Sequence, residues 1–178
     1  ATQESNWRHD ALRVCPTVGQ RRYHQPRTLN LAATQGGGTS KSDQFFLNAS
    51  KRRDVDSDGF FDVIAHGNKN EVEVFTPNGP VAADQRVLAK LIKSDPNYGG
   101  QPIRLLSCET GSCDLGFAQN LANKMGVPVK APTDLVWAYG DGKMVVAPRR
   151  SLDRNSPLFN QPNLSRQGEF KIFKQKVQ

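Results

Sequence analysis

Two short apolar runs of the sequence each end in a residue that could take part in nucleophilic catalysis. The first run, FDVIAHGN, has the length of a β-strand and is followed directly by His66 and Gly67. The second run, PIRLLSCETGSC, ends in Ser107 and Cys108. A cysteine attacks as the thiolate, and a histidine within reach can take its proton and later protonate a leaving amine. The residue types therefore predict thiol chemistry, provided that the two strand ends meet in space.

Each of these residues has a candidate role in the hydrolysis of an amide bond. Cys108 is the candidate nucleophile, and a helix beginning near Asp114 would bring its positive end close to the sulfur and lower the pKa of the thiol. His66 is the candidate acid and base. Gly67 lets a carbonyl group approach, and its backbone N–H, together with that of Cys108, could form an oxyanion hole. The structural alternative is that Cys108 is a small buried side chain and His66 a loop residue bonded to backbone.

Around these motifs the apolar pattern alternates between strands and helices. We expect strands at residues 61–65, 71–76, 103–107, 127–131, 135–139 and 143–147, with one helix within 81–94 and another from Asp114 to a stop at Gly126. Alternating strands and helices are typical of a parallel sheet with right-handed crossovers. Because sites in such sheets lie at the carboxyl ends of the strands, His66 and Cys108 are expected at one edge of the sheet.

Length and composition favour a single globular domain behind an irregular segment. The chain of 178 residues is long enough to bury one core, and it has no apolar run of 18 residues, so no membrane span is expected. Residues 1–44 contain prolines and glycines that interrupt regular secondary structure. They are expected to form an irregular N-terminal arm or linker with a short strand candidate at 28–32. Residues 45–178 are expected to form the catalytic domain. The first residues do not resemble a signal peptide, which favours a fragment or processed domain.

The net charge bears on the expected partners, and the cysteine count bears on disulfides and zinc sites. The formal net charge of +7 favours acidic partners. However, the basic residues occur in short pairs without the interleaved aromatic residues that single-stranded nucleic-acid binders use, so nucleic acid is not the expected partner. Three cysteines form neither a disulfide framework nor the spacing of a zinc site.

The two motif blocks resemble a known group of enzymes. FDVIAHGN followed by PIRLLSCETG is similar to the paired His-Gly and Cys blocks of the clan CD cysteine peptidases, which include caspases, gingipains, clostripain and the self-cleaving domains of large bacterial toxins. The stretch from Phe61 to Val146 also resembles the C-terminal toxin domains of bacterial polymorphic toxins of the Rhs/WapA and contact-dependent types. This resemblance covers about half of the chain.

The resemblance implies a fold, an activity and a setting. It implies an α/β, three-layer caspase-like sandwich with a mostly parallel central sheet, and a catalytic dyad that falls on Cys108 and His66. It also implies a toxin effector that is secreted or delivered as the C-terminal part of a larger bacterial protein and acts in the target-cell cytoplasm. Its partners would be a protein substrate and a cognate immunity protein, the latter plausibly acidic to complement the basic chain.

The substrate pocket has no short motif that the resemblance can transfer. Asp134, in the segment APTDLVW, could line a pocket for a basic side chain, or it could cap a turn beside Pro132. Glu109, directly after Cys108, is the second substrate-binding candidate.

The segment DVDSDG resembles the first half of a calcium-binding loop. It has carboxylates at alternate positions, Asp54, Asp56 and Asp58, and a glycine for the sharp turn. The bidentate Glu of the twelfth loop position is missing, because that position is Ala65. The alternatives are a calcium site that steadies the strand carrying His66, or a plain acidic turn. No other cofactor is expected.

Three functional hypotheses follow. The leading one is a cysteine peptidase-like thiol hydrolase that cleaves a target-cell protein or processes its own parent chain. The same Cys108–His66 dyad would equally serve a deamidase or an acyltransferase, because the acyl-enzyme is common to them. The alternative from another class is a basic nucleic-acid-targeting toxin domain in which Cys108 only packs.

Overall fold

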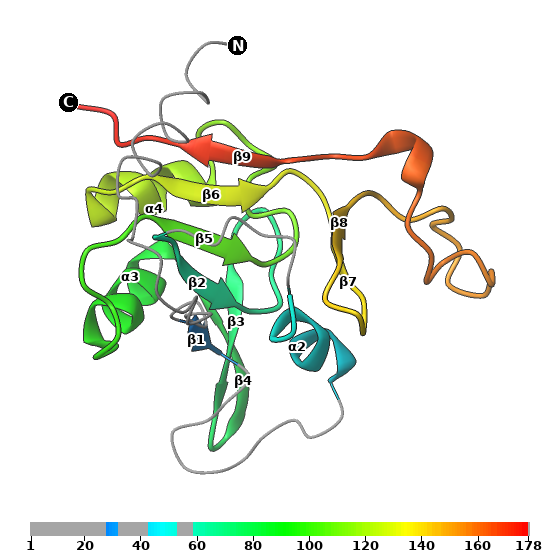
Figure 1. The fold of residues 1–178 in the computed structure, drawn as a ribbon, viewed down its shortest axis with the longest axis horizontal. Coiled ribbons are helices and arrows are strands. Elements are labelled where there is room, and N and C mark those ends of the chain that lie inside the picture. The colour runs from blue at the N-terminus through cyan, green and yellow to red at the C-terminus, as the bar shows by residue number, and fades with distance from the viewer. Residues whose placement is uncertain (1–27, 32–42, 53–58, 178) are drawn as a thin grey trace, which may run out of the picture.

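The computed structural model of the protein describes residues 28–31, 43–52 and 59–177. Along the chain the elements are β1 (Thr28–Asn30), α2 (Gln44–Ala49), β2 (Phe61–Ile64), β3 (Val72–Thr76), β4 (Gly79–Ala83), α3 (Gln85–Ser94), β5 (Ile103–Leu106), α4 (Phe117–Met125), β6 (Val129–Pro132), β7 (Val136–Ala138), β8 (Met144–Val146), a single 3-10 turn η1 (Leu164–Arg166) and β9 (Phe170–Phe173). Figure 1 shows their arrangement.

A five-stranded sheet organises the fold, in the order β1-β2-β5-β6-β9. The first four of these strands are parallel to one another, and β9 runs antiparallel to β6 along the opposite edge. The expectation of a mostly parallel central sheet is therefore confirmed. β1 falls within residues 1–44, for which an irregular arm was expected, and it pairs with β2 at the short strand that the sequence indicated there.

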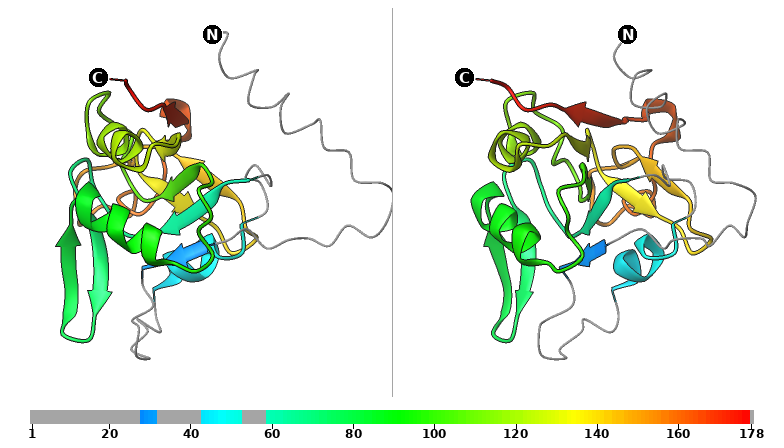
Figure 2. Two further views of the ribbon diagram at one scale, coloured as in Figure 1. Left: turned by 90° about the vertical axis from the view of Figure 1, so that its left-hand side faces the viewer. Right: turned by 60° about the vertical axis from the view of Figure 1, so that its left-hand side comes forward.

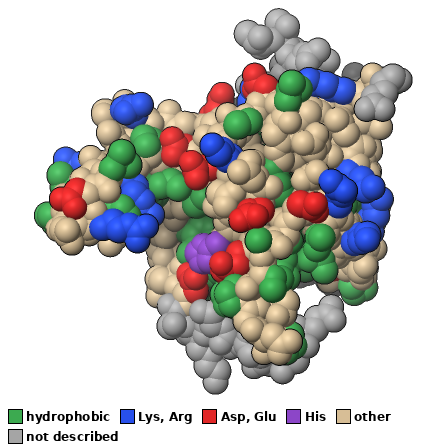
Figure 3. Space-filling view, turned by 180° about the vertical axis from the view of Figure 1, so that it is seen from behind, with side chains coloured by type: hydrophobic (Ala, Val, Ile, Leu, Met, Phe, Trp, Pro, Cys, Tyr) green, Lys and Arg blue, Asp and Glu red, His purple; other side chains and the backbone are tan. Residues whose placement is uncertain are grey.

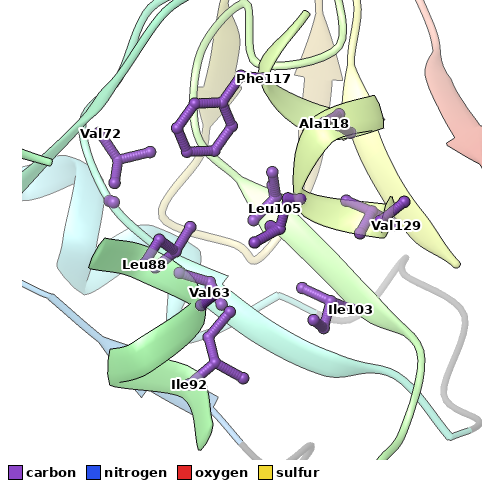
Figure 4. Close-up of a cluster of buried hydrophobic side chains, with 14 of the residues drawn as sticks. Val63, Val72, Leu88, Ile92, Ile103, Leu105, Phe117, Ala118 and Val129 are labelled. Atoms are coloured by element: carbon purple, nitrogen blue, oxygen red, sulfur yellow. The ribbon is translucent and has the colours of Figure 1, made fainter. Parts of the chain in front are cut away.

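One face of the sheet is covered by α3 and α4, which pack side by side across it (Figures 1 and 2). Their apolar residues meet inward-facing residues of β2, β5 and β6 in the main hydrophobic core, together with the start of the β3–β4 hairpin (Figure 4). Strand side chains alternate between faces, so Val63 and Leu105 point into this core. We call this side the helix face.

The opposite side, which we call the site face, has a much smaller core. Ile64 and Leu106 pack there against Phe46 and Ala49 of α2. The six-residue α2 and the β7–β8 hairpin lie against this face, and both are short elements. The structure is thus a mixed α/β fold with few helices. The caspase-like three-layer sandwich that the resemblance implies is not established by this arrangement.

Capping explains where the longer helices begin. Asp84 precedes α3, and its carboxylate accepts the backbone N–H groups of Arg86 and Val87 at 2.9 and 3.0 Å. The helix expected to start at Asp114 begins later, because α4 starts at Phe117 with Gly116 at its N-cap position. The Asp114 carboxylate instead forms an exposed ion pair with Lys171.

A buried ionic cluster lies on the site face at the amino ends of the strands. Asp62 of β2 accepts hydrogen bonds from Arg104 of β5, at 2.7 and 2.9 Å, and also pairs with Arg52. The side chains of all three residues are at most 2% exposed. Arg52 also donates to the carbonyl of Ala49, the last residue of α2, at 3.0 Å. The cluster therefore ties α2 to the central strands.

Within the described ranges, no helix combines the length and apolar character needed to cross a membrane.

Candidate active site

The register of the central strands brings the two motif ends together. β2 and β5 pair in parallel with Ile64 opposite Leu106, and the N–H of Ala65 continues the ladder to the Leu106 carbonyl at 3.3 Å. His66 and Cys108 each follow that pair by two residues, beyond the last paired residues of the two strands. His66 contacts Phe45 and Phe46 of α2, and Cys108 contacts Val136 of β7, so both lie beside elements that cover the site face.

The His66 ring is held by α2. Its Nε2 lies 2.5 Å from the Asp43 carboxylate oxygen Oδ2. The ring stacks on Phe45 with centroids 5.4 Å apart and meets the edge of Phe46 at 5.0 Å. The His66 side chain is still 40% exposed, and Figure 3 shows the one described histidine at the surface beside acidic side chains. The ring is thus fixed in orientation yet open to a reactant.

Asp43 is the site residue that sequence reasoning missed. It directly precedes α2 and serves as its N-cap, with Oδ1 accepting the backbone N–H of Phe45 at 3.0 Å. It was assigned to the irregular N-terminal arm because α2 is too short to show helical periodicity. The available signal was local: an Asp immediately before an apolar pair is a typical helix start.

The Cys108 thiol is turned toward the start of β7. Its sulfur accepts the backbone N–H of Val136 at 3.3 Å and lies 4.0 Å from the Val136 carbonyl oxygen. Burial raises the pKa of the Cys108 thiol, and Glu109 adds to the rise, while the Val136 N–H and Arg149 oppose it. The prediction of a thiol pKa lowered by a helix end was therefore wrong. In this structure Cys108 is a neutral thiol at neutral pH.

The two candidate residues of the dyad contact different elements. Among the described residues, no hydrogen bond joins the His66 ring to the Cys108 sulfur. His66 is engaged by Asp43 and Cys108 by Val136. Hydrogen bonds between catalytic groups are often long before substrate binds, so this separation is compatible with a dyad that tightens on binding.

The loop after Cys108 is locked onto the end of β6. The N–H of Glu109 donates to the Asp134 carbonyl at 2.9 Å, and that of Gly111 donates to the Pro132 carbonyl at 2.8 Å. Glu109 has a φ of 58°, an uncommon left-handed conformation for a residue with a side chain. A Cβ on Gly111 would lie 2.5 Å from the Ala131 carbonyl oxygen, so only glycine permits this approach. The nucleophile candidate thus sits on a tightly held turn.

Both substrate-binding candidates lie beside this turn and are partly exposed. The Asp134 carboxylate accepts the backbone N–H of Leu135 at 2.8 Å. No described contact assigns Glu109 or Asp134 to a substrate.

The structure leaves no room for a side chain at Gly67. A Cβ at this position would lie 2.2 Å from Ser107 Oγ and 3.1 Å from the Glu71 carbonyl oxygen, so a larger residue would collide with the neighbouring strand end. Within the described residues, neither the N–H of Gly67 nor that of Cys108 donates to a backbone carbonyl. Both N–H groups proposed for the oxyanion hole are thus unused by the backbone ladder.

Arg149 is a second residue that the sequence did not single out. Its guanidinium packs 4.1 Å from the centroid of the Phe159 ring and 5.6 Å from that of Trp137, and it donates to the Phe159 carbonyl at 3.0 Å. It is close enough to Cys108 to oppose the rise of the thiol pKa. Only the pair Arg149-Arg150 marked it in the sequence.

The calcium candidates Asp54, Asp56 and Asp58 lie outside the described residues. Among the residues that are described, no group of three or more His, Cys, Asp or Glu side chains is placed to hold a metal ion. Cys113 is free and exposed at the far end of the same loop as Cys108.

Comparison with known proteins gives one match. Residues 29–146 match the family model described as a domain of unknown function, DUF8616. No curated protein and no solved structure matches the chain. The matched segment covers well over half of the sequence and includes Asp43, His66 and Cys108, whereas Arg149 lies just beyond it. The chain belongs to the DUF8616 family.

Proposed function

We propose that the protein is a cysteine peptidase-like thiol hydrolase that cleaves an amide bond with Cys108 as nucleophile and His66 as acid and base. The observation that supports the proposal is the β2–β5 register: Ile64 lies opposite Leu106, and His66 and Cys108 each follow that pair by two residues. Carboxyl ends of parallel strands are the usual location of catalytic groups in open α/β sheets.

The raised pKa of the Cys108 thiol determines when the thiol loses its proton in such a mechanism. Because Cys108 is a neutral thiol, it is activated during the reaction rather than stored as a thiolate. His66 takes the thiol proton as the sulfur attacks the carbonyl carbon and the C=O π electrons move to the oxygen. The N–H groups of Gly67 and Cys108 donate to that oxyanion.

The second half of the cycle returns the site to its starting state. The oxyanion collapses, the C–N bond breaks, and His66 gives its proton to the leaving amine. Water, deprotonated by His66, then attacks the thioester, and the thiol leaves with its proton restored. An amine or a second acceptor in place of water would give acyl transfer, and a side-chain amide as substrate would give deamidation.

The resemblance to clan CD peptidases and polymorphic toxins extends this proposal. The histidine and cysteine blocks carry it, and a mostly parallel sheet is compatible with a caspase-like fold. On this basis the protein is a toxin effector delivered as the C-terminal part of a larger bacterial protein. Its substrate is a protein of the target cell or its own parent chain, and its antagonist is an acidic immunity protein.

Site-directed labelling tests the chemistry. We expect peptidyl acyloxymethyl ketones with varied side chains next to the reactive group to modify Cys108 selectively, as located by mass spectrometry. His66→Ala should slow that labelling by about 10²- to 10⁴-fold, the usual contribution of a general base. Cys113→Ala is the matched control, because Cys113 is free and exposed on the same loop and should not affect the rate.

A peptide digest then identifies the reaction. We expect the wild-type protein to cut members of a proteome-derived peptide library and Cys108→Ala to cut none, while circular dichroism shows the same fold. Deamidated or acylated products instead of cleaved ones would assign the other reactions of the same intermediate. Cys108 labelling that is no faster than that of Cys113 and independent of His66 would overturn the proposal, and salt-dependent binding to nucleic acid would then be measured.

A further inference from the structure

We propose that Asp43 is the positioning residue of this site: its carboxylate fixes the tautomer and the orientation of His66, so that the base is supplied by Nδ1. The inference rests on the proposed function, and it names a third site residue from a segment that sequence reasoning placed outside the catalytic domain. It is carried by the 2.5 Å contact between Asp43 Oδ2 and His66 Nε2.

The chemistry of the contact selects one tautomer. A carboxylate only accepts hydrogen bonds, so His66 must donate from Nε2. In the neutral imidazole one nitrogen donates and the other accepts, which leaves Nδ1 unprotonated and able to take a proton. When the ring becomes an imidazolium during the reaction, the Asp43 carboxylate faces the new positive charge. Both effects favour proton transfer from a neutral thiol such as Cys108.

The carboxylate is held in place by two independent restraints. Its Oδ1 is committed to the N–H of Phe45, so rotation of the side chain would break the cap of α2. The same helix supplies the two rings, Phe45 and Phe46, that pack around the imidazole. The contacts of the His66 ring among the described residues therefore come from the N-cap and the first turn of one short helix.

That helix is itself anchored to the sheet and to the β7–β8 hairpin. Asn48 donates from its amide to the Ala138 carbonyl at 2.9 Å, and Arg52 joins the end of the helix to Asp62 of β2. A Cβ on Gly142 in the hairpin turn would lie 2.3 Å from the Lys51 carbonyl oxygen, so the turn is in direct contact with the chain after α2. Cys108 contacts the same hairpin through Val136. His66 is thus held by α2, Cys108 contacts β7, and α2 and β7 contact each other.

Substitutions at the N-cap separate the carboxylate from the cap. Asp43→Asn keeps an N-cap residue of equal quality but removes the charge, whereas Asp43→Ala removes both. The matched control is Asp84→Asn at the N-cap of α3, which has the same local role and no contact with the site. We expect Asp43→Asn to slow the labelling of Cys108 by roughly 10- to 10⁴-fold, with Asp84→Asn unchanged. The thermal unfolding midpoint of Asp43→Asn should stay near that of the wild type.

The direct readout is the ¹⁵N NMR spectrum of the His66 ring. We expect the Nε2–H tautomer in the wild type and a shift toward the Nδ1–H tautomer or a mixture in Asp43→Asn. If Asp43 only stabilised the start of α2, Asp43→Asn would change neither the tautomer of His66 nor the rate of Cys108 labelling. Unchanged tautomer and unchanged labelling in Asp43→Asn would overturn the inference.

Failure of the proposed function gives a different pattern. If Cys108 labelling is slow in the wild type and indifferent to His66→Ala, the hydrolase is refuted, whereas the NMR spectra still decide whether Asp43 sets the tautomer. If His66→Ala slows labelling and Asp43→Asn does not, the hydrolase proposal is supported and the positioning role of Asp43 is refuted.

Discussion

The two faces of the central sheet differ in what covers them. The helix face is packed by α3 and α4 into an apolar core that includes Val63 and Leu105 (Figure 4). Leu121 of α4 belongs to the same core. The site face has an apolar cluster of four buried residues, contributed by α2, β2 and β5. Around that small cluster lie polar and ionisable groups: the buried ionic cluster at one end of the strands and the His66–Asp43 pair at the other.

We infer that the helix face contributes mainly to folding stability and that the site face carries the candidate catalytic groups. Burial of apolar area on the helix face supplies most of the driving force for folding. The site face has less apolar packing and more ionisable groups, which are costly to bury, and one of them, Asp43, holds the His66 ring. Substitutions on the two faces should therefore affect different measurements.

The largest expected effect on stability comes from the ionic cluster of the site face. Asp62→Ala would leave the guanidinium groups of Arg52 and Arg104 buried without an anion, and we expect the free energy of unfolding to fall by about 3–5 kcal/mol. Urea denaturation measures the loss. Asp114→Ala, which removes an exposed ion pair, is the control and should change stability much less. Equal losses in the two variants would show that burial of the cluster contributes nothing.

A cavity on the helix face should have a slightly smaller effect and should spare the chemistry. Leu121→Ala removes a fully buried side chain of α4, and we expect a loss of about 2–5 kcal/mol in the free energy of unfolding. Leu115→Ala is the control, because that side chain is 72% exposed. The rate of Cys108 labelling should be the same in both variants under native conditions. A slowed rate in Leu121→Ala would contradict the separation of the two faces.

The smallest expected effect is a pH dependence of stability that originates in Cys108. Burial raises its pKa in the folded state, so above about pH 8.5 the unfolded thiol loses its proton while the folded thiol keeps it. The free energy of unfolding should therefore fall as the pH rises above that value, until the folded thiol titrates. Urea melts between about pH 7 and 10 should show a shallower alkaline decline for Cys108→Ala. Cys113→Ala is the control, and an identical decline in Cys108→Ala and the wild type would rule out a raised pKa for the Cys108 thiol.

Patterns of several residues predicted the central elements well. The apolar runs at 61–65 and 103–107 became β2 and β5, which are buried along their whole length. The strands expected at 135–139 and 143–147 became β7 and β8, which pair as a hairpin through the turn Gly140-Asp141-Gly142. These features depend on local hydrophobicity and turn chemistry, which are visible in a short window of sequence.

Other elements were missed. β4 begins with Gly79 and Pro80, which obscure its strand character, and it pairs with β3 in a hairpin. β9 was not predicted although its sequence FKIF favours a strand, and it pairs with β6. α2 is six residues long, too short for a helical period, and it is stabilised by its cap and by packing on Ile64 and Leu106. The pKa of Cys108 was predicted in the wrong direction, because burial of the thiol, which raises its pKa, depends on the tertiary structure.

The sequence by itself determined that a histidine and a cysteine follow two buried parallel strands, because strand burial and the strand–helix alternation are local patterns. Tertiary structure alone decided the rest of the candidate site. The β2–β5 register set Ile64 opposite Leu106, two residues before His66 and Cys108, and the docking of α2 brought Asp43 from 23 positions away to the imidazole. Contacts between residues far apart in the chain depend on packing of the whole sheet, and no window of sequence contains that information.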